Sequence, residues 1–121
     1  MLSTFAQYSA LGLLLLRLAI AFIFAYHGYP KLKKPVQMAA GLGWPVNAIR
    51  ILGTFEILGA LGVTLAFHTQ LAALIFALVM VGAIYYKITR WHVPFWAHDN
   101  TGWEFDLILL AVAIFFLTNP M

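Results

Sequence analysis

The sequence predicts an all-α integral membrane protein, folded as a four-helix bundle of four transmembrane helices in a single domain over residues 1–121. Hydrophobic residues make up 64% of the chain and charged residues only 9%, whereas soluble domains carry roughly 25% charged residues. The apolar residues form long runs separated by short polar segments. Because a helix needs about 20 residues to cross a bilayer, the chain has room for about four spans.

The first span is expected at about residues 8–29, ending where Pro30 and three nearby lysines make continued burial unfavourable. At 100° per residue, one face of this helix is small and polar. Since small residues permit close helix approach, this face should point into the bundle. Its members are Arg17, Ala21, Ala25 and Gly28.

The second span is expected at about residues 46–67, and it carries a carboxylate, Glu56, near its middle. An ionisable group at that depth is costly, so it is a candidate functional residue and it requires a partner. Glu56 shares a face with small residues, which again indicates an inward orientation. The other members of that face are Gly53, Gly59, Ala60 and Val63.

The third and fourth spans are expected at about residues 71–86 and 103–118. Between the first two spans, residues 37–42 are weakly apolar and could form one interfacial turn. The connection at residues 87–102 is rich in tryptophan and histidine, a composition suited to the headgroup region, where it would act as a lid.

Six of the seven Lys and Arg residues lie in the connections 30–45 and 87–102 or at the helix ends beside them. The positive-inside rule therefore predicts a multi-pass cell membrane protein with both connections cytoplasmic and both termini outside. The same distribution explains the net charge of +3, so the basic residues do not indicate nucleic-acid binding.

Depth counting suggests a partner for Glu56. Arg17 lies roughly 13 Å from the outer end of the first span and Glu56 roughly 17 Å from the outer end of the second. A buried ion pair between Arg17 and Glu56 would satisfy both side chains. Such a pair could be structural, fixing helix rotation with little net stabilisation, or it could belong to a ligand site.

A second polar cluster is expected within about two turns of the cytoplasmic interface. Its mixture of cation, imidazole, phenol and carboxylate could bind a polar head group or a quinone-like ring, or these could be ordinary interfacial residues. We take as ligand-binding candidates His27, Lys31, Arg50, Tyr86, Trp103 and Glu104. The chain has no cysteine, and the spacing of its histidines indicates neither a metal site nor bis-histidine haem.

Several stretches together resemble the DoxX/DoxD family of small four-helix membrane proteins. They are Arg17, the segment YHGYPKL at residues 26–32, the segment GTFEILGALGV at residues 53–63, and the pair Trp103-Glu104. The resemblance implies a four-span bundle whose polar motif positions are Arg17, His27, Gly28, Lys31, Glu56 and Glu104. Relatives in this family include a subunit of thiosulfate:quinone oxidoreductase and components associated with oxidative-stress complexes.

Three functions are compatible with these observations. The first is an accessory, non-catalytic subunit of a quinone-linked membrane redox system, with quinone as the candidate cofactor bound among the polar residues. The second is a membrane assembly factor that binds a membrane or peripheral protein partner. The third is a small transporter, because intramembrane charges can mark a translocation path. The small-residue faces could also support a homo-oligomer.

Overall fold

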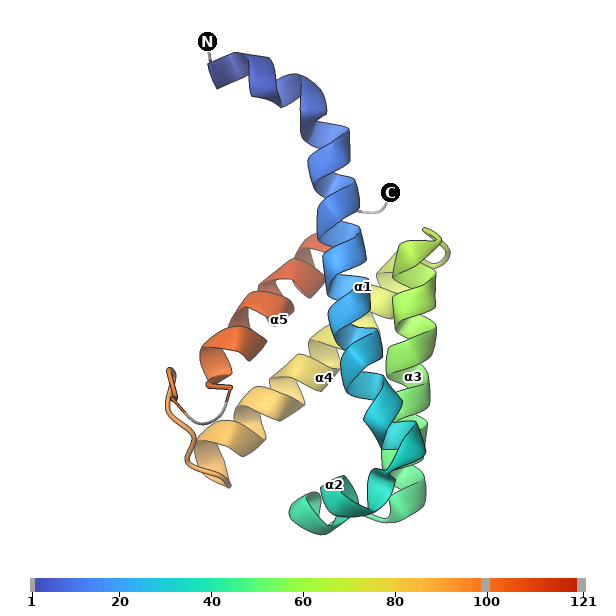
Figure 1. Cartoon of the computed structure of the whole chain (residues 1–121), viewed down its shortest axis with the longest axis vertical. Coiled ribbons are helices and arrows are strands. Elements are labelled where there is room, and N and C mark those ends of the chain that lie inside the picture. Colours follow the sequence, from blue (N-terminus) through green and yellow to red (C-terminus); the bar gives the residue numbers. More distant parts are fainter. Residues whose placement is uncertain (1, 99–100, 120–121) are drawn as a thin grey trace. The chain divides into compact units, whose positions relative to one another are not determined.

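The structure is a computed structural model that describes residues 2–98 and 101–119 (Figure 1). Within those residues every regular element is helical, which confirms the all-α fold class. The chain divides into two compact units, Met1–Phe67 and His68–Met121, and each is described by itself. The single four-helix bundle therefore stays a prediction.

The first unit contains the short 3-10 helix η1 (Leu2–Tyr8) and the α-helices α1 (Ser9–Lys33), α2 (Pro35–Leu42) and α3 (Val46–Thr64). The long helices α1 and α3 run side by side in opposite directions, and the short α2 lies across the turn that joins them (Figure 1). The interfacial turn expected at residues 37–42 is thus part of a two-turn helix.

Pro30 lies inside α1 rather than at its end, so the boundary expected at residue 29 is one turn too early. A proline removes one backbone donor, but its carbonyl oxygen remains available. Here Pro30 O accepts a 2.7 Å hydrogen bond from Lys34 N, and Lys34 ends the helix. The extra turn keeps Lys31 within α1, three residues after Gly28 and therefore on the same buried face of the helix.

The joint between α2 and α3 follows from three residues in sequence. Gly43 adopts φ 72°, a left-handed conformation that ends α2 and that glycine tolerates without strain. Trp44 N donates a 3.0 Å hydrogen bond back to Ala39 O. Pro45 is extended, with φ −63° and ψ 148°, and α3 starts at the next residue.

The second unit is a helical hairpin of α4 (Thr69–Thr89) and α5 (Trp103–Thr118). At the open end of the hairpin, Gln70 Nε2 donates a 2.9 Å hydrogen bond to Leu117 O. The buried residues of both helices are mostly small or aromatic, and they include Ala73, Phe76, Ala77, Leu109, Ala113 and Phe116.

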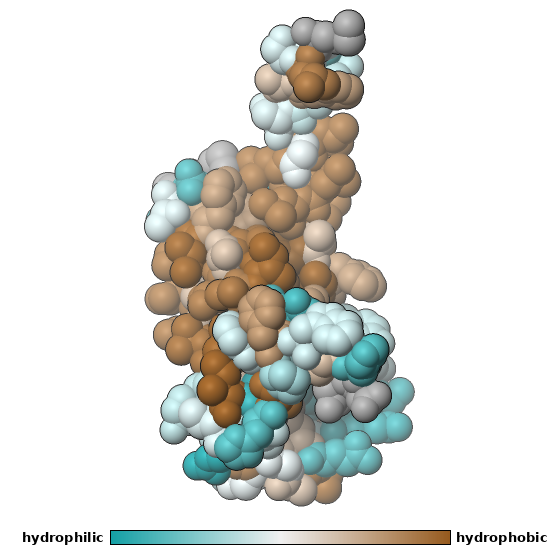
Figure 2. All heavy atoms as spheres, turned by 90° about the vertical axis from the view of Figure 1, so that its left-hand side faces the viewer, coloured by the Kyte–Doolittle hydropathy of each residue, from teal (hydrophilic) through white to brown (hydrophobic). Residues whose placement is uncertain are grey.

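Three helical stretches among the described residues are long and apolar enough to cross a membrane, namely Leu2–Lys33, Val46–Thr64 and Thr69–Thr89. The fourth expected span is a helix at the expected place, but α5 has only 16 residues. Four transmembrane helices therefore stay a prediction. Hydrophobic side chains cover long stretches of the exposed surface (Figure 2), with Phe22 71% exposed and Leu78 64% exposed, as lipid-facing helices require.

Candidate functional site

A buried ion pair joins the two long helices of the first unit. Lys31, in the last turn of α1, donates a hydrogen bond from Nζ to Oε1 of Glu56, in the middle of α3. The Glu56 residue is only 1% exposed and Lys31 is 8% exposed. Two opposite charges buried together satisfy each other, whereas either one alone would be strongly unfavourable there.

Two glycines allow the helices to approach closely enough for this pair to form. A Cβ atom on Gly53 would lie 2.7 Å from Lys31 Cβ and 2.8 Å from Gly28 O. A Cβ atom on Gly28 would lie 3.0 Å from both Glu56 Cβ and Gly53 O. All four distances are shorter than ordinary van der Waals contacts, so α1 and α3 cross with backbone against backbone.

The structure gives Glu56 a different partner from the expected Arg17. Arg17 Nη1 donates a 2.8 Å hydrogen bond to Val63 O, which lies seven residues, or roughly 10 Å, further along α3. The depth count assumed that residues 8 and 67 lie at the same level. In the structure Lys31 packs against Gly53, so the N-terminal part of α1 extends well beyond the C-terminal end of α3. Lysine side chains also lean toward the helix N-terminus, which carries the Lys31 ammonium toward Glu56.

The inward faces expected for these helices are confirmed. Arg17, Ala21 and Gly28 are buried on α1, and Ala25 is half-buried beside them. On α3 every member of the expected face is buried, namely Gly53, Glu56, Gly59, Ala60 and Val63. The 3.6-residue period therefore located the correct faces, although it did not determine which charges meet.

A second ion pair lies in the other unit, between Lys87 and Asp106. Lys87 Nζ lies 2.7 Å from Asp106 Oδ2 and also donates a 3.0 Å hydrogen bond to Thr101 O. The sequence analysis did not anticipate this pair, because Lys87 lies at a helix end beside a connection and Asp106 lies in a first helical turn, where the helix dipole already favours a carboxylate. One signal was present: Asp106 is in register with Leu109, Ala113 and Phe116, the buried stripe of α5.

The expected lid at residues 87–102 folds back onto the start of α5; its residues 99 and 100 lie outside the described residues. Glu104 N donates a 3.1 Å hydrogen bond to Phe95 O, and the rings of Phe95 and Trp103 meet edge to face at 4.7 Å. A Cβ atom on Gly102 would overlap the Phe95 carbonyl. The segment thus caps α5 with a backbone carbonyl rather than with a free side chain.

The six candidate ligand-binding residues are divided equally between the units. His27, Lys31 and Arg50 belong to the first unit, where His27 and Arg50 are exposed and Lys31 is occupied by Glu56. In the second unit, Glu104 is exposed, whereas Tyr86 and Trp103 are half-buried. A common site for these residues stays a prediction.

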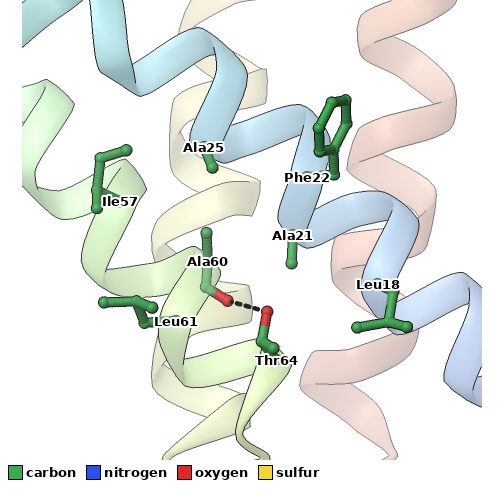
Figure 3. A pocket seen from close by; sticks show the side chains of 8 residues that line it. All are labelled: Leu18, Ala21, Phe22, Ala25, Ile57, Ala60, Leu61 and Thr64. Atoms are coloured by element: carbon green, nitrogen blue, oxygen red, sulfur yellow. Dashed lines mark hydrogen bonds between the residues drawn. The ribbon is translucent and has the colours of Figure 1, made fainter.

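An open groove of about 420 Å³ runs along one side of the α1–α3 contact (Figure 3). From α1 it is lined by Leu18, Ala21, Phe22 and Ala25, and from α3 by Ile57, Ala60, Leu61 and Thr64. Its polar group is the Thr64 hydroxyl, which donates a 2.8 Å hydrogen bond to Ala60 O within the helix. The groove is therefore apolar, and the alanines that create it were noted in the sequence only as packing residues.

Across residues 2–98 and 101–119, no three His, Asp or Glu side chains gather closely enough to hold a metal ion. Two Lys–carboxylate pairs, a guanidinium bonded to a carbonyl and an apolar groove are among the features of the two units. Such groups can orient a molecule or hold charge inside an apolar fold.

Comparison with known proteins gives one family and one relative. Residues 12–98 match the sequence model of the DoxX family. The chain is 29% identical over 107 residues to a Bacillus subtilis (strain 168) protein named "Putative oxidoreductase CatD", an alignment that covers 86% of this chain and 75% of that protein. No solved structure matches the chain.

Proposed function

Because this chain belongs to the DoxX family, we propose that it is a multi-pass membrane protein with four transmembrane helices that serves as a non-catalytic subunit of a quinone-linked redox system. Its role would be to bind a small lipophilic or polar molecule, with a quinone as the candidate. The binding groups would be the exposed polar residues at the basic end of the helices.

The observation that carries this proposal is the buried Lys31–Glu56 pair. It lies inside a unit whose exposed side chains are largely apolar. Ionisable residues inside membrane helices are rare, and they usually mark a functional site. The name of the Bacillus subtilis relative, "Putative oxidoreductase CatD", supports a redox association. Since the chain contains no cysteine, thiol redox chemistry would have to come from a partner protein.

The ligand-binding part of this proposal is tested by thermal unfolding in mild detergent with a short-chain quinone analogue. A ligand at about 100 times its Kd adds about 2.7 kcal/mol of stability, which is a shift of several degrees. The wild type should shift, and Glu104→Gln and His27→Ala should shift much less. The variant Gln7→Ala changes an exposed polar residue of η1, at the other end of α1 from Lys31; it serves as a control and should behave like the wild type. Equal shifts in all four proteins would contradict quinone binding at these residues.

A second candidate function is an assembly factor or interaction protein. The observation that favours it is the direct hydrogen bond between Lys31 and Glu56. A pair that is satisfied in this way would fix how α1 and α3 are rotated against each other rather than bind a ligand. This function requires a protein that co-purifies with the chain in mild detergent and that is lost when the helix pair is disrupted. Co-purification without any quinone shift would favour assembly over ligand binding.

A further inference from the structure

The apolar groove and Arg50 lie on the same side of α3. The groove occupies two turns of that helix, from Ile57 to Thr64. Arg50 lies seven residues before Ile57, which places it on nearly the same helix face, 20° away after two turns. It is exposed, and it lies roughly 10 Å from the near end of the groove along the helix axis.

The basic end of this unit has no acidic side chain beside it in the sequence. Glu56 is the sole carboxylate among residues 1–67, and it is buried against Lys31. Arg50, Lys33 and Lys34 are all exposed. Lys33 also lies over the ring of Tyr29, 5.7 Å from its centre. This end is therefore complementary to an anionic group.

We propose that this side of the first unit binds one anionic phospholipid. Its phosphate would lie beside Arg50, with Lys33 and Lys34 nearby, and one acyl chain would follow the groove between α1 and α3. The proposal uses Arg50, which is also a candidate for ligand binding, but of the proposed function it requires only the membrane location and not quinone binding.

The depth of the groove agrees with this assignment. One leaflet contributes about 15 Å of hydrocarbon, half of the roughly 30 Å core. At about 1.5 Å per residue, the groove covers the interval from roughly 10 Å to 20 Å beyond Arg50. Because the headgroup layer adds about 5 Å or more outside the hydrocarbon, this interval is reached by the distal part of an acyl chain whose phosphate lies beside Arg50. Small side chains at Ala21, Ala25 and Ala60 create the space (Figure 3). An anionic headgroup next to exposed cations suits the negatively charged leaflet, which attracts basic segments.

The wild-type protein gives the first test. It is reconstituted in phosphatidylcholine nanodiscs with phosphatidylglycerol that carries a photoreactive diazirine in its acyl chain, and the labelled peptides are mapped. Labelling should concentrate on residues 18–25 and 57–64, and excess unlabelled phosphatidylglycerol should displace it. Labelling no stronger than on the exposed apolar side chains Leu107, Ile108 and Ile114 of α5, or not displaced, would overturn the proposal. That outcome is also expected if a second copy or another helix of the chain fills the groove.

Two matched pairs of variants give the second test. Ala25→Leu fills the groove, whereas Ala19→Leu makes the same change at an exposed position of α1 outside the lining. The first should lower specific labelling at least about fivefold and the second should not. Arg50→Gln should reduce the preference for phosphatidylglycerol over phosphatidylcholine about fivefold, and Arg90→Gln should retain it. Equal behaviour within either pair would contradict the proposal, and the wild-type map decides it if Ala25→Leu does not fold.

Discussion

Both units of the molecule hold an ion pair of the same design, placed at different depths. In each, a lysine in the last turn of one long helix meets an acidic residue on the other long helix of the unit. A Gly-Trp sequence comes just before or at the start of that second helix. Glu56 is the eleventh residue of α3, whereas Asp106 is the fourth residue of α5. The first pair therefore lies roughly 10 Å deeper along its helix than the second.

The two pairs are also supported differently. Around Lys31–Glu56 the support is close packing, because Gly28 and Gly53 bring two backbones together. Around Lys87–Asp106 the support is a loop, because Lys87 also bonds the carbonyl of Thr101. The comparison teaches that a deep pair requires small residues around it, whereas a shallow pair can rely on the connecting segment. The deep pair is accordingly the stronger candidate for a functional role.

The largest expected effect is at Glu56. Glu56→Ala leaves the Lys31 ammonium buried without a counter-charge, and removing one member of a buried pair costs about 3–5 kcal/mol. Thermal or denaturant unfolding in detergent should show this loss. The control Leu58→Ala changes a side chain that is 57% exposed and should change stability little. Similar losses in the two variants would place Glu56 outside the core of the unit.

Two glycine substitutions test whether close helix packing supports the deep pair. Gly53→Ala introduces a Cβ atom 2.7 Å from Lys31 Cβ and 2.8 Å from backbone, and such overpacking costs about 1–3 kcal/mol. Gly82→Ala is the matched control, since a Cβ atom there meets nothing within 4 Å. It should leave stability unchanged or raise it by up to about 1 kcal/mol through helix propensity. A stable Gly53→Ala protein would show that α1 and α3 do not cross at this point.

Removing one member of the shallow pair, Lys87–Asp106, should cost less stability than removing Glu56. Lys87→Met removes the partner of Asp106 and the donor to Thr101, and we expect a loss of about 1–2 kcal/mol for the unsatisfied buried group. Unfolding measurements compare it with Glu56→Ala, while Arg90→Met controls for the lost charge. A loss larger than that of Glu56→Ala would reverse the order of the two pairs.

The smallest effect is expected in the segment that caps α5. Phe95→Ala removes an edge-to-face contact with Trp103, worth about 1 kcal/mol. The change should appear locally, as faster proteolysis within residues 91–98 and faster hydrogen exchange at the Glu104 amide. Trp96→Ala is the control, because the Trp96 ring contacts His98 within the same segment, whereas the Phe95 ring contacts Trp103 on α5. Unchanged proteolysis in Phe95→Ala would show that the ring contact does not hold the segment.

Sequence reasoning located the helices and their buried faces because both follow from hydropathy and the 3.6-residue period. The buried face containing Gly53 and Glu56 is as expected, and the helix expected at residues 103–118 has those bounds. It did not identify the partner of Glu56, because helix register depends on where two backbones cross. The Gly28–Gly53 contact decides that register, and it is a tertiary contact between two connected helices.

The Asp106 partner was missed for a related reason. A carboxylate in a first helical turn is stabilised by the helix dipole, so the local explanation was already sufficient. Only its register with the buried residues of α5 indicated a second role. The groove was missed because it is formed by small residues on two helices, and their sequence pattern is the same whether the space between them is filled or open.

A double-mutant cycle tests most directly whether Lys31 and Glu56 are partners. Lys31→Met and Glu56→Leu are made singly and together, and the free energy of unfolding is measured for all four proteins. We expect each single variant to lose about 3–5 kcal/mol and the double variant to recover most of that loss, because replacing a whole buried pair with apolar residues is often nearly neutral. The resulting coupling energy should exceed about 2 kcal/mol. Additive losses, with a coupling energy near zero, would contradict the pairing.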